Sequence, residues 1–437
     1  MGLPAWRRRL LLAVLLTLAA PAPAVQPAHA QPDETVAAVV RDAHAFIVEY
    51  ALRPADPGVL LHRALAAAQL AVPGTVPPVL TGVLEQDTAA SAGYVASALR
   101  TLPTGVQEAG LAAVVRAMLR ELADPFAAVF PPDAFTRFRE ELRGERGSIG
   151  VQIDAGPAGE TVISDVTPGG PAAREGLLPG DVIEQAGGRG TLSLTPDEVL
   201  RILRGAPGTA LTLAVRRGLS VRTLILTRAV VRENATRARL VEARVGYLRL
   251  LEFSRRSARD LSRAMMTLRS GGAEVLILDL RLNGGGLVDE AVDVASVFLS
   301  EGVVALEERR AGTETLGVRR VDRFPGPVVV LVDRATASAS EIVAGALQDA
   351  GAPVVGLPTY GKTTVQAVTI PPLPGGWGLR LTTARYVTRA GRSIDGTGVI
   401  PTVIVPMDPA LVQAPGDAQY REALVLARAR LPARASP

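Results

Sequence analysis

The spacing of apolar residues changes twice along the chain, which divides it into three regions. In the first region, up to about residue 143, alanine and leucine recur at helical spacing and proline-rich breaks separate the segments. This pattern predicts helices over residues 34–50, 58–70 and 106–122. It favours a helical accessory or dimerisation region.

The second and third regions have the patterns of a β domain and an α/β domain. Between residues 147 and 227, short β-branched runs alternate with glycine and proline turns. The runs predict strands over 149–153, 161–166, 210–215 and 221–226, with one helix over 196–203. From Val245 buried strands alternate with helices, which indicates an α/β core. Its expected strands are 245–253, 275–280, 328–332 and 353–355, and its helices 258–268, 287–299 and 340–349.

The first thirty residues have the features of a secretory signal peptide. Three arginines at 7–9 precede an apolar run over residues 10–20, and an Ala-x-Ala cleavage site ends at Ala30. A spanning helix needs about 20 apolar residues, and prolines follow this shorter run. We therefore expect an exported, periplasmic or extracytoplasmic protein that begins near Gln31 and has no membrane span in its mature form.

Composition limits the chemistry that the mature chain can perform. Lysine and arginine total 47 against 43 Asp and Glu, and the signal arginines account for most of this excess, so nothing favours a nucleic-acid partner. The chain has no cysteine, which excludes thiol nucleophiles, disulfides and cysteine-ligated metal sites. All three histidines lie within the first 62 residues, which disfavours a Ser-His-Asp site in the C-terminal half.

Lys362 is the only lysine of the chain. Lysine can lose its proton when it is desolvated, whereas arginine stays protonated, so this lysine points to a chemistry that arginine cannot supply. The residues from Gly356 to Thr363 also fit the phosphate-loop pattern G-x-x-x-x-G-K-[ST]. That motif requires a following helix, but residues 364–370 are alternating and β-branched, which predicts a strand. Nucleotide binding is therefore disfavoured.

Two further motifs belong to the same α/β region. Residues 333–341 (DRATASASE) place Ser338 before a helix, where free N–H groups can stabilise an oxyanion. Taken alone, this stretch favours an ordinary helix N-cap. Residues 279–286 (DLRLNGGG) follow a buried strand as a glycine loop, for which the alternative is a tight strand-to-helix turn. Each signal is weak, but they cluster in one core with the sole lysine.

Together these stretches resemble the carboxyl-terminal processing, or tail-specific, serine proteases of peptidase family S41, which use a Ser-Lys dyad. The family carries D-L-R-x-N-P-G-G, [ST]-A-S-A-S-E-I and G-K-G-T-V-Q stretches, matched here in order by residues 279–286, 336–342 and 361–366. The resemblance covers roughly residues 122–405. The site residues that it implies are Ser338 as nucleophile, Lys362 as base, Gln366 as the residue that orients the lysine, Asp349 at an acidic position sometimes implicated, and the backbone N–H groups of Gly285 and Ala339 as oxyanion donors. Such a mechanism needs no metal or cofactor.

The chain departs from the family pattern at four positions. Gly284 replaces a proline and Thr363 a glycine. Residues 391–401 resemble the family's G-x-S-I-x-G-x-G-I-x-P stretch, in which Asp395 replaces the usual glutamine, and Thr402 replaces the aspartate that usually follows it. Gly284 and Thr363 adjoin the proposed oxyanion loop and base, so they bear on loop geometry and rate, not on the identity of the dyad.

The β region resembles a PDZ domain. Residues 147–151 are similar to its carboxylate-binding loop, and residues 164–173 and 176–183 match two further stretches, which disfavours a plain β-rich spacer. In such a loop, successive N–H groups bind a terminal carboxylate while the peptide adds a strand to the sheet edge. The substrate-binding residues implied here are Ser148, Ile149, Gly150 and Val151.

The expected fold is multidomain α/β (α+β). Its parts are a signal peptide (1–30), a helical N-terminal region (31–142), an inserted PDZ domain (143–230), a Ser-Lys protease core of the ClpP/crotonase-like type (231–408) and a C-terminal tail (409–437). The expected function is an exported serine endopeptidase that binds protein substrates by their free C-termini. A homo-oligomer or an adaptor protein is a further expected partner. The alternative is a catalytically silent PDZ protein that recruits exported partners.

Overall fold

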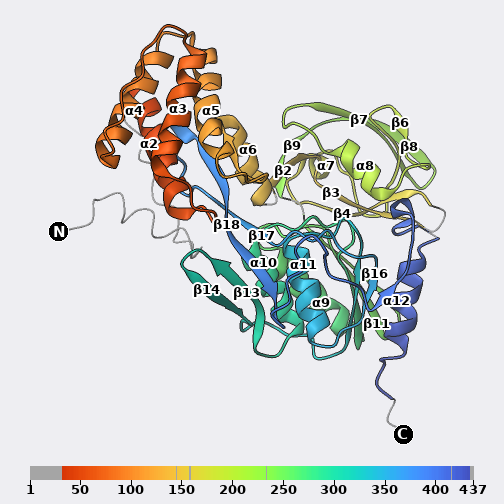
Figure 1. The fold of residues 1–437 in the computed structure, drawn as a ribbon. Helices are drawn as coiled ribbons and strands as arrows, with labels where there is room; N and C mark the ends of the chain where they lie inside the picture. The colour runs from red at the N-terminus through yellow and green to blue at the C-terminus, as the bar shows by residue number, and fades with distance from the viewer. Residues whose placement is uncertain (1–31, 144, 157–158, 233, 415, 434–437) are drawn as a thin grey trace. The chain divides into compact units, whose positions relative to one another are not determined.

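The computed structural model describes residues 32–433 except 144, 157–158, 233 and 415 (Figure 1). The predicted signal peptide therefore lies outside the described residues. The chain forms two compact units. An N-terminal unit consists of the residues up to Phe138 together with Glu308–Thr313 and Thr364–Arg385, and a second unit contains the rest. None of the helices in the described part of the chain has the length and apolar character needed to cross a membrane.

Helices form most of the N-terminal unit. They are α2 (Pro32–Tyr50), α3 (Pro57–Ala71), α4 (Leu84–Leu99) and α5 (Thr104–Arg120), and α6 (Pro132–Leu142) begins in this unit. The first four share one apolar core that includes Val39, Leu60, Val95 and Val115. The predicted helices correspond to α2, α3 and α5; α4 and α6 lie within the region predicted to be helical, but their bounds were not predicted. In α4, polar and small residues interrupt the apolar spacing.

A sheet completes the N-terminal unit. The long strand β18 (Gly378–Thr388) pairs antiparallel with β1 (Ala128–Phe130) and with β17 (Thr364–Val368). Leu379 and Leu381 of β18 are buried in the helical core. The same sheet contains β13 (Val303–Arg309) and β14 (Gly312–Gly317). The helical region expected over residues 31–142 is thus not self-contained, because strands from the C-terminal half complete its core.

The predicted PDZ domain forms a sheet of its own in the order β3-β4-β5-β7-β8, with β6 paired to β5. Its elements are β3 (Val151–Ala155), β4 (Thr161–Val166), α7 (Pro171–Arg174), β5 (Val182–Ala186), β6 (Arg189–Gly190), α8 (Pro196–Leu203), β7 (Ala210–Arg217) and β8 (Ser220–Thr227). Ile153, Ile163 and Leu213 pack with Val199 and Leu203 of α8 in the domain core. The two ends of the domain are joined by pairing of β2 (Glu145–Ser148) with β9 (Ala229–Arg232).

A second sheet of the second unit has the order β10-β11-β12-β15-β16-β19. Its strands are β10 (Thr236–Glu242), β11 (Val245–Leu250), β12 (Val275–Asp279), β15 (Val328–Val332), β16 (Val354–Gly356) and β19 (Val403–Ile404). In this sheet β10 pairs antiparallel with β11, and the other neighbours are parallel. Strands β12 and β15 are buried along their whole length, as expected for parallel strands covered on both faces.

Helices lie on both faces of this sheet (Figure 1). They are α9 (Ser257–Ser270), α10 (Val288–Phe298), α11 (Ala339–Asp349) and α12 (Ala418–Arg428). Ala423 and Ala427 of α12 pack on the face that bears Ile277 and Leu331. The expected C-terminal tail therefore contains a helix that belongs to the core. Because neighbouring parallel strands point the same way, the segments that follow β12, β15 and β16 all leave the same edge of the sheet.

Candidate active site

The three motifs meet at the carboxyl edge of the parallel sheet. The glycine loop follows β12, Ser338 follows β15, and Lys362 lies on the segment between β16 and β17. Nζ of Lys362 is 3.5 Å from Oγ of Ser338. This is long for a hydrogen bond, but bonds between catalytic groups often shorten only in the substrate complex. The structure therefore brings together the two residues that the sequence predicted as a dyad.

Ser338 has an unusual backbone conformation. Its φ is 57° and its ψ is −118° at the N-cap of α11, a region that residues other than glycine rarely occupy. Such strain persists only where the surrounding structure fixes it, and it is concentrated at functional sites. The N-cap interpretation and the nucleophile interpretation apply to the same residue, because Ser338 begins the helix while its hydroxyl lies near Lys362.

Glu341 connects the backbones of these two residues. Its side chain is fully buried, and Oε2 accepts the N–H groups of Ser338 at 2.7 Å and Lys362 at 2.9 Å. Oε1 accepts the hydroxyl of Thr359 at 2.5 Å and the N–H of Gly361 at 2.6 Å. Four donors thus converge on one carboxylate. Glu341 lies within the motif at residues 336–342, but no role was predicted for it. Its position three residues after the N-cap Ser338 is the sequence feature that indicates such a contact.

The glycine loop lies directly against Ser338. A Cβ on Gly285 would come within 2.7 Å of the Ala337 carbonyl oxygen and 2.8 Å of Ser338 Cβ, and its φ is +100°. The Gly285 N–H donates to Oδ1 of Asn283 at 2.9 Å, so the oxyanion role predicted for it requires that this bond be exchanged. Ala339 is the first residue of α11, and its N–H has no acceptor within the helix.

Buried polar groups fix the glycine loop relative to Ser338. Asn283 is fully buried and donates from Nδ2 to the Leu250 carbonyl at 2.9 Å. The backbone carbonyl oxygen of Asn283 accepts the N–H of Ala337 at 3.1 Å and the hydroxyl of Ser340 at 2.9 Å. Asp333 accepts the N–H of Leu282 at 3.1 Å. The glycine loop and the segment before α11 therefore form one hydrogen-bonded layer.

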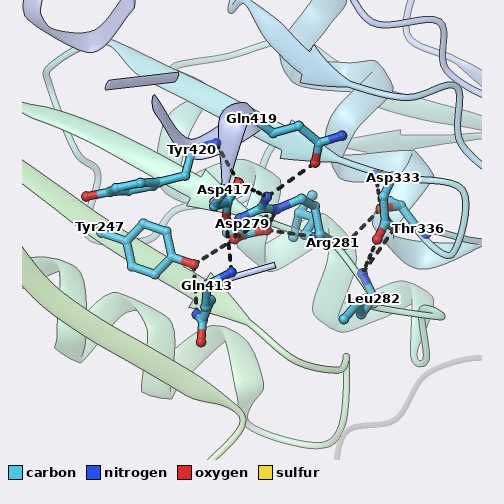
Figure 2. A network of polar contacts seen from close by, with 11 residues as sticks. Tyr247, Asp279, Arg281, Leu282, Asp333, Thr336, Gln413, Asp417, Gln419 and Tyr420 are labelled. Atoms are coloured by element: carbon cyan, nitrogen blue, oxygen red, sulfur yellow. Dashed lines mark hydrogen bonds and ion pairs between the residues drawn. The ribbon is translucent and has the colours of Figure 1, made fainter. Parts of the chain in front are cut away.

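Behind this layer lies a fully buried ion cluster (Figure 2). Arg281 donates from Nη2 to Asp279 at 2.6 Å and from Nη1 to Asp417 at 2.8 Å, and Tyr247 donates to Asp279 at 2.6 Å. Burial alone would raise the pKa of Asp279, but the Arg281 guanidinium outweighs it and the pKa is lowered. Since Asp417 is the N-cap of α12, the C-terminal segment anchors the strand end from which the glycine loop begins.

The resemblance also implied roles for Gln366 and Asp349. Gln366 lies on β17 in the N-terminal unit, where its Nε2 donates to the hydroxyls of Thr364 at 3.0 Å and Thr382 at 3.2 Å; its role toward Lys362 stays a prediction. Asp349 is the last residue of α11, about 16 Å along the helix from its N-terminal end at about 1.5 Å per residue. It pairs with Arg392 and accepts the N–H of Ala390 at 2.9 Å, so it is not beside the dyad.

The predicted carboxylate loop precedes β3, an edge strand of the PDZ sheet. Gly150 has a φ of +77° and donates its N–H to Oγ of Ser148 at 3.0 Å. Ile149 is buried and its carbonyl accepts the N–H of Ala172 at 2.9 Å. Val151 begins β3 and is buried against the domain core. An open strand edge next to a glycine turn and an apolar core has the form of a peptide-binding edge.

Two other kinds of site find no support in the structure. The segment after Lys362 is the strand β17, so the helix that a phosphate-binding loop requires is missing from the described residues there. Within the ranges that the structure describes, no three or more His, Asp or Glu side chains come together as ligands for a metal ion.

Comparisons with known proteins show the family to which the chain belongs. The family model for peptidase family S41 matches residues 244–405, and that for the PDZ domain matches residues 162–217. A carboxyl-terminal-processing protease of Picosynechococcus is 34% identical over 71% of this chain and 77% of the relative. The chloroplastic carboxyl-terminal-processing peptidase 2 of Arabidopsis thaliana is 37% identical over 72% of this chain, which spans 64% of that relative. A Bacteroides fragilis structure described as an S41 protease, 18% identical over 89% of this chain and 97% of that chain, has a TM-score of 0.50 and shows the fold alone. The chain therefore belongs to peptidase family S41, with the carboxyl-terminal processing proteases as its relatives and a PDZ domain within it.

Proposed function

We propose that this protein is an exported serine endopeptidase that binds the C-terminal tail of protein substrates through its PDZ domain and cleaves them with Ser338 and Lys362. One observation carries the proposal: the only lysine of the chain places Nζ 3.5 Å from the hydroxyl of a strained serine at a helix N-terminus. A catalytically silent binding protein would need neither the strain nor the amine.

The proposed reaction begins with proton transfer from Ser338 to Lys362. Oγ of Ser338 then attacks the scissile carbonyl carbon, and the new oxyanion lies toward the N–H of Ala339 at the positive end of the α11 dipole. Collapse of this intermediate breaks the C–N bond, and the leaving amine takes the proton from the Lys362 ammonium. Water then hydrolyses the acyl-enzyme with Lys362 again as base.

Lys362 must be neutral to act as a base. The usual pKa of a lysine is about 10.4, so the proposed mechanism requires that desolvation lower it substantially. The Lys362 side chain is only partly exposed, in a segment that buried Glu341 fixes by its N–H groups. The Glu341 carboxylate accepts hydrogen bonds from three backbone N–H groups and one hydroxyl. The amine of Lys362 lies near the hydroxyl of Ser338.

Tail recognition is proposed from the open edge of β3. A bound tail would pair with this strand, and its carboxylate would lie at the turn formed by Ser148–Val151. The domain core includes the apolar residues Ile153 of β3 and Val199 of α8, and an apolar C-terminal residue is the proposed ligand of this edge. Export is proposed from the signal sequence within residues 1–30.

The test uses an unfolded protein that ends in an apolar tail as substrate. We expect hydrolysis by the wild type, none by Ser338→Ala, and none by Lys362→Arg or Lys362→Ala, since arginine keeps the charge but cannot accept the proton. A lysine that served only in an ion pair would tolerate arginine. A wild type that binds the tail tightly but never cleaves it would establish the binding protein instead.

Tail recognition is tested with the same substrate carrying a C-terminal carboxamide. Loss of the terminal charge should weaken binding and lower the rate at limiting substrate concentration, while cleavage still depends on Ser338. Substitution of Gly150 is a poorer test, because it would strain the turn itself: the φ is +77°, and an added Cβ would lie 3.2 Å from Cβ of Thr167. Equal rates for both substrates would contradict recognition of the carboxylate.

A further inference from the structure

Tyr386 on β18 lies between the backbones of Ser338 and Lys362. Its side chain is 1% exposed, and its hydroxyl is 3.0 Å from the carbonyl oxygen of Ser338 and 3.1 Å from that of Lys362. A phenol carries one proton and a carbonyl oxygen can only accept, so the two carbonyls share that proton. The N–H of Tyr386 also donates to the Thr363 carbonyl at 3.0 Å, which fixes the ring's own backbone to the same segment.

Glu341 makes the complementary contacts. Its carboxylate accepts the N–H groups of Ser338 and Lys362, while Tyr386 donates to the carbonyl oxygens of the same two residues. Ser338 and Lys362 lie 24 residues apart on separate segments. Two buried side chains, one an acceptor and the other a donor, thus hold each residue by both of its backbone polar groups.

The conformation of Ser338 explains why such restraint is needed. With a φ of 57° and a ψ of −118°, this residue would relax if its peptide groups were free to turn. Relaxation would swing the hydroxyl away from the amine of Lys362, because the direction of a side chain follows the backbone that carries it. The Ser338 carbonyl accepts the Tyr386 hydroxyl together with the N–H groups of Glu341 at 2.8 Å and Ile342 at 3.1 Å. It belongs to the peptide whose N–H is that of Ala339, the proposed oxyanion donor, so rotation of this peptide would also move that N–H.

We propose that Tyr386 is a positioning residue of the catalytic site, which holds Ser338 in its strained conformation and keeps Lys362 within reach of it by a proton shared between their carbonyl oxygens. This inference rests on the proposed function, since it concerns the placement of that dyad. Tyr386 does not exchange protons with the substrate. Burial raises the pKa of Tyr386 well above its usual value, and the nearby charges of Glu341 and Asp395 raise the pKa further, so the hydroxyl remains a donor.

The experiment compares Tyr386→Phe with the wild type on the tailed substrate. We expect kcat to fall about 10- to 100-fold, since a displacement of about 1 Å at a reacting group can cost a factor of that order. KM and the affinity for the tail should change less than about twofold, because the PDZ domain is untouched. A looser site admits water, which favours the ammonium form of Lys362, so the rising limb of the pH profile should move to higher pH.

The matched control is Tyr94→Phe, which removes a phenol bonded to the Thr75 hydroxyl at 2.7 Å in the N-terminal unit and should leave kcat unchanged. A Tyr386→Phe enzyme with normal kcat would overturn the inference. The inference would also be overturned if kcat fell only in proportion to the folded protein measured by circular dichroism and the pH profile did not change. That result would mean a purely structural role for Tyr386.

A second variant changes Glu341, which accepts the N–H groups of Ser338 and Lys362. Glu341→Gln keeps the size of the side chain but turns an amide N–H donor toward groups that are themselves donors, and we expect the same loss of kcat and the same pH shift. If Tyr386→Phe yields no folded enzyme, this variant decides, and normal kinetics would overturn the inference. Ser338→Ala distinguishes failure of the proposed function from failure of the inference about Tyr386. If Ser338→Ala still cleaves the substrate, both fail. If Ser338→Ala is inactive and Tyr386→Phe is fully active, only the role of Tyr386 is refuted.

Discussion

Thr363 donates its hydroxyl to Oδ1 of Asp395 at 2.7 Å. Both residues depart from the motifs of the family, where glycine and glutamine are usual, and the structure shows that the two departures contact each other. Next to them, the N–H of Gly396 donates to the Gly361 carbonyl at 2.9 Å. The segment that carries Lys362 is therefore joined to residues 394–398 by a side-chain bond in addition to the backbone bond.

This contact predicts that the two substitutions act as one unit. Thr363→Val keeps the shape of the side chain but removes the donor, and should lower the free energy of unfolding by about 1 kcal/mol. Asp395→Ala should cost a similar amount, and the double variant should cost little more than either single one, as expected for residues in contact. Urea denaturation of the four proteins measures the coupling. Fully additive losses would mean that the hydrogen bond contributes nothing.

A second prediction concerns the buried cluster around Arg281. Arg281→Met leaves the carboxylates of Asp279 and Asp417 buried without their counterion, which should lower the free energy of unfolding by about 3–5 kcal/mol at pH 7. The control is Arg319→Met, which breaks exposed pairs with Asp289 and Asp293 and should cost less than about 1 kcal/mol. Equal losses for the two variants would show that burial does not distinguish them.

The pH dependence of this difference has a defined sign. Arg281 lowers the pKa of Asp279 in the folded protein, so the stability that Asp279 contributes is present above its unfolded pKa of about 3.9 and is lost as the pH falls below that value. The advantage of the wild type over Arg281→Met should therefore narrow from pH 7 to pH 3. A gap that widens in acid would contradict the assigned direction.

Much of this site was predictable because its determinants are local. Unbroken apolar runs predicted β12 and β15, and the apolar spacing predicted α11. The pairing of Ser338 with Lys362 was implied by the family resemblance. The partners of these residues had no local signal. Arg281 and Asp417 are 136 residues apart, and no spacing rule connects them.

Long-range pairing also limits what the sequence alone shows about the N-terminal unit. Strand β1 pairs with β18 through the register of Val129 with Leu379, which joins a short segment to one 250 residues later. The composition of the helical region alone therefore gave no reason to include residues 364–385 in it. Tyr386 was missed for the same reason, since one aromatic residue in a strand resembles any other until its hydroxyl partners are known.

A third prediction concerns the PDZ domain. Asp181 is 1% exposed and accepts two hydrogen bonds from Arg217, from Nε and Nη2 at 2.6 Å each. These bonds hold the pKa of Asp181 below its usual range, so its contribution to stability is present above about pH 4 and is lost as the pH falls further. Asp181→Asn should lower the hydrogen-exchange protection of β5 and β7 at pH 7, and by a smaller margin near pH 3.

Glu184→Gln is the matched control for that experiment. Glu184 pairs with Arg216 on the same two strands, but both side chains are more than a third exposed, so water screens the pair and the effect should be small. If the two variants lower protection equally, or if the Asp181→Asn deficit grows in acid, the proposed contribution of the buried pair is wrong.

The last prediction uses the single ε-amine of the chain. Isotopic dimethylation of Lys362 should give one side-chain NMR signal, apart from that of the N-terminus, because no other lysine is present. If Lys362 is the base, this signal should titrate well below the usual lysine pKa of about 10.4, since desolvation disfavours the ammonium form. The rising limb of the pH profile of acylation should report the same value, because only the neutral amine accepts the Ser338 proton. Ser338→Ala is the control in which the amine remains but the proposed nucleophile is gone. In this variant the Lys362 signal should still titrate well below about 10.4, while turnover is absent. An amine that stays protonated up to about pH 10, together with turnover that persists at neutral pH, would refute the dyad mechanism.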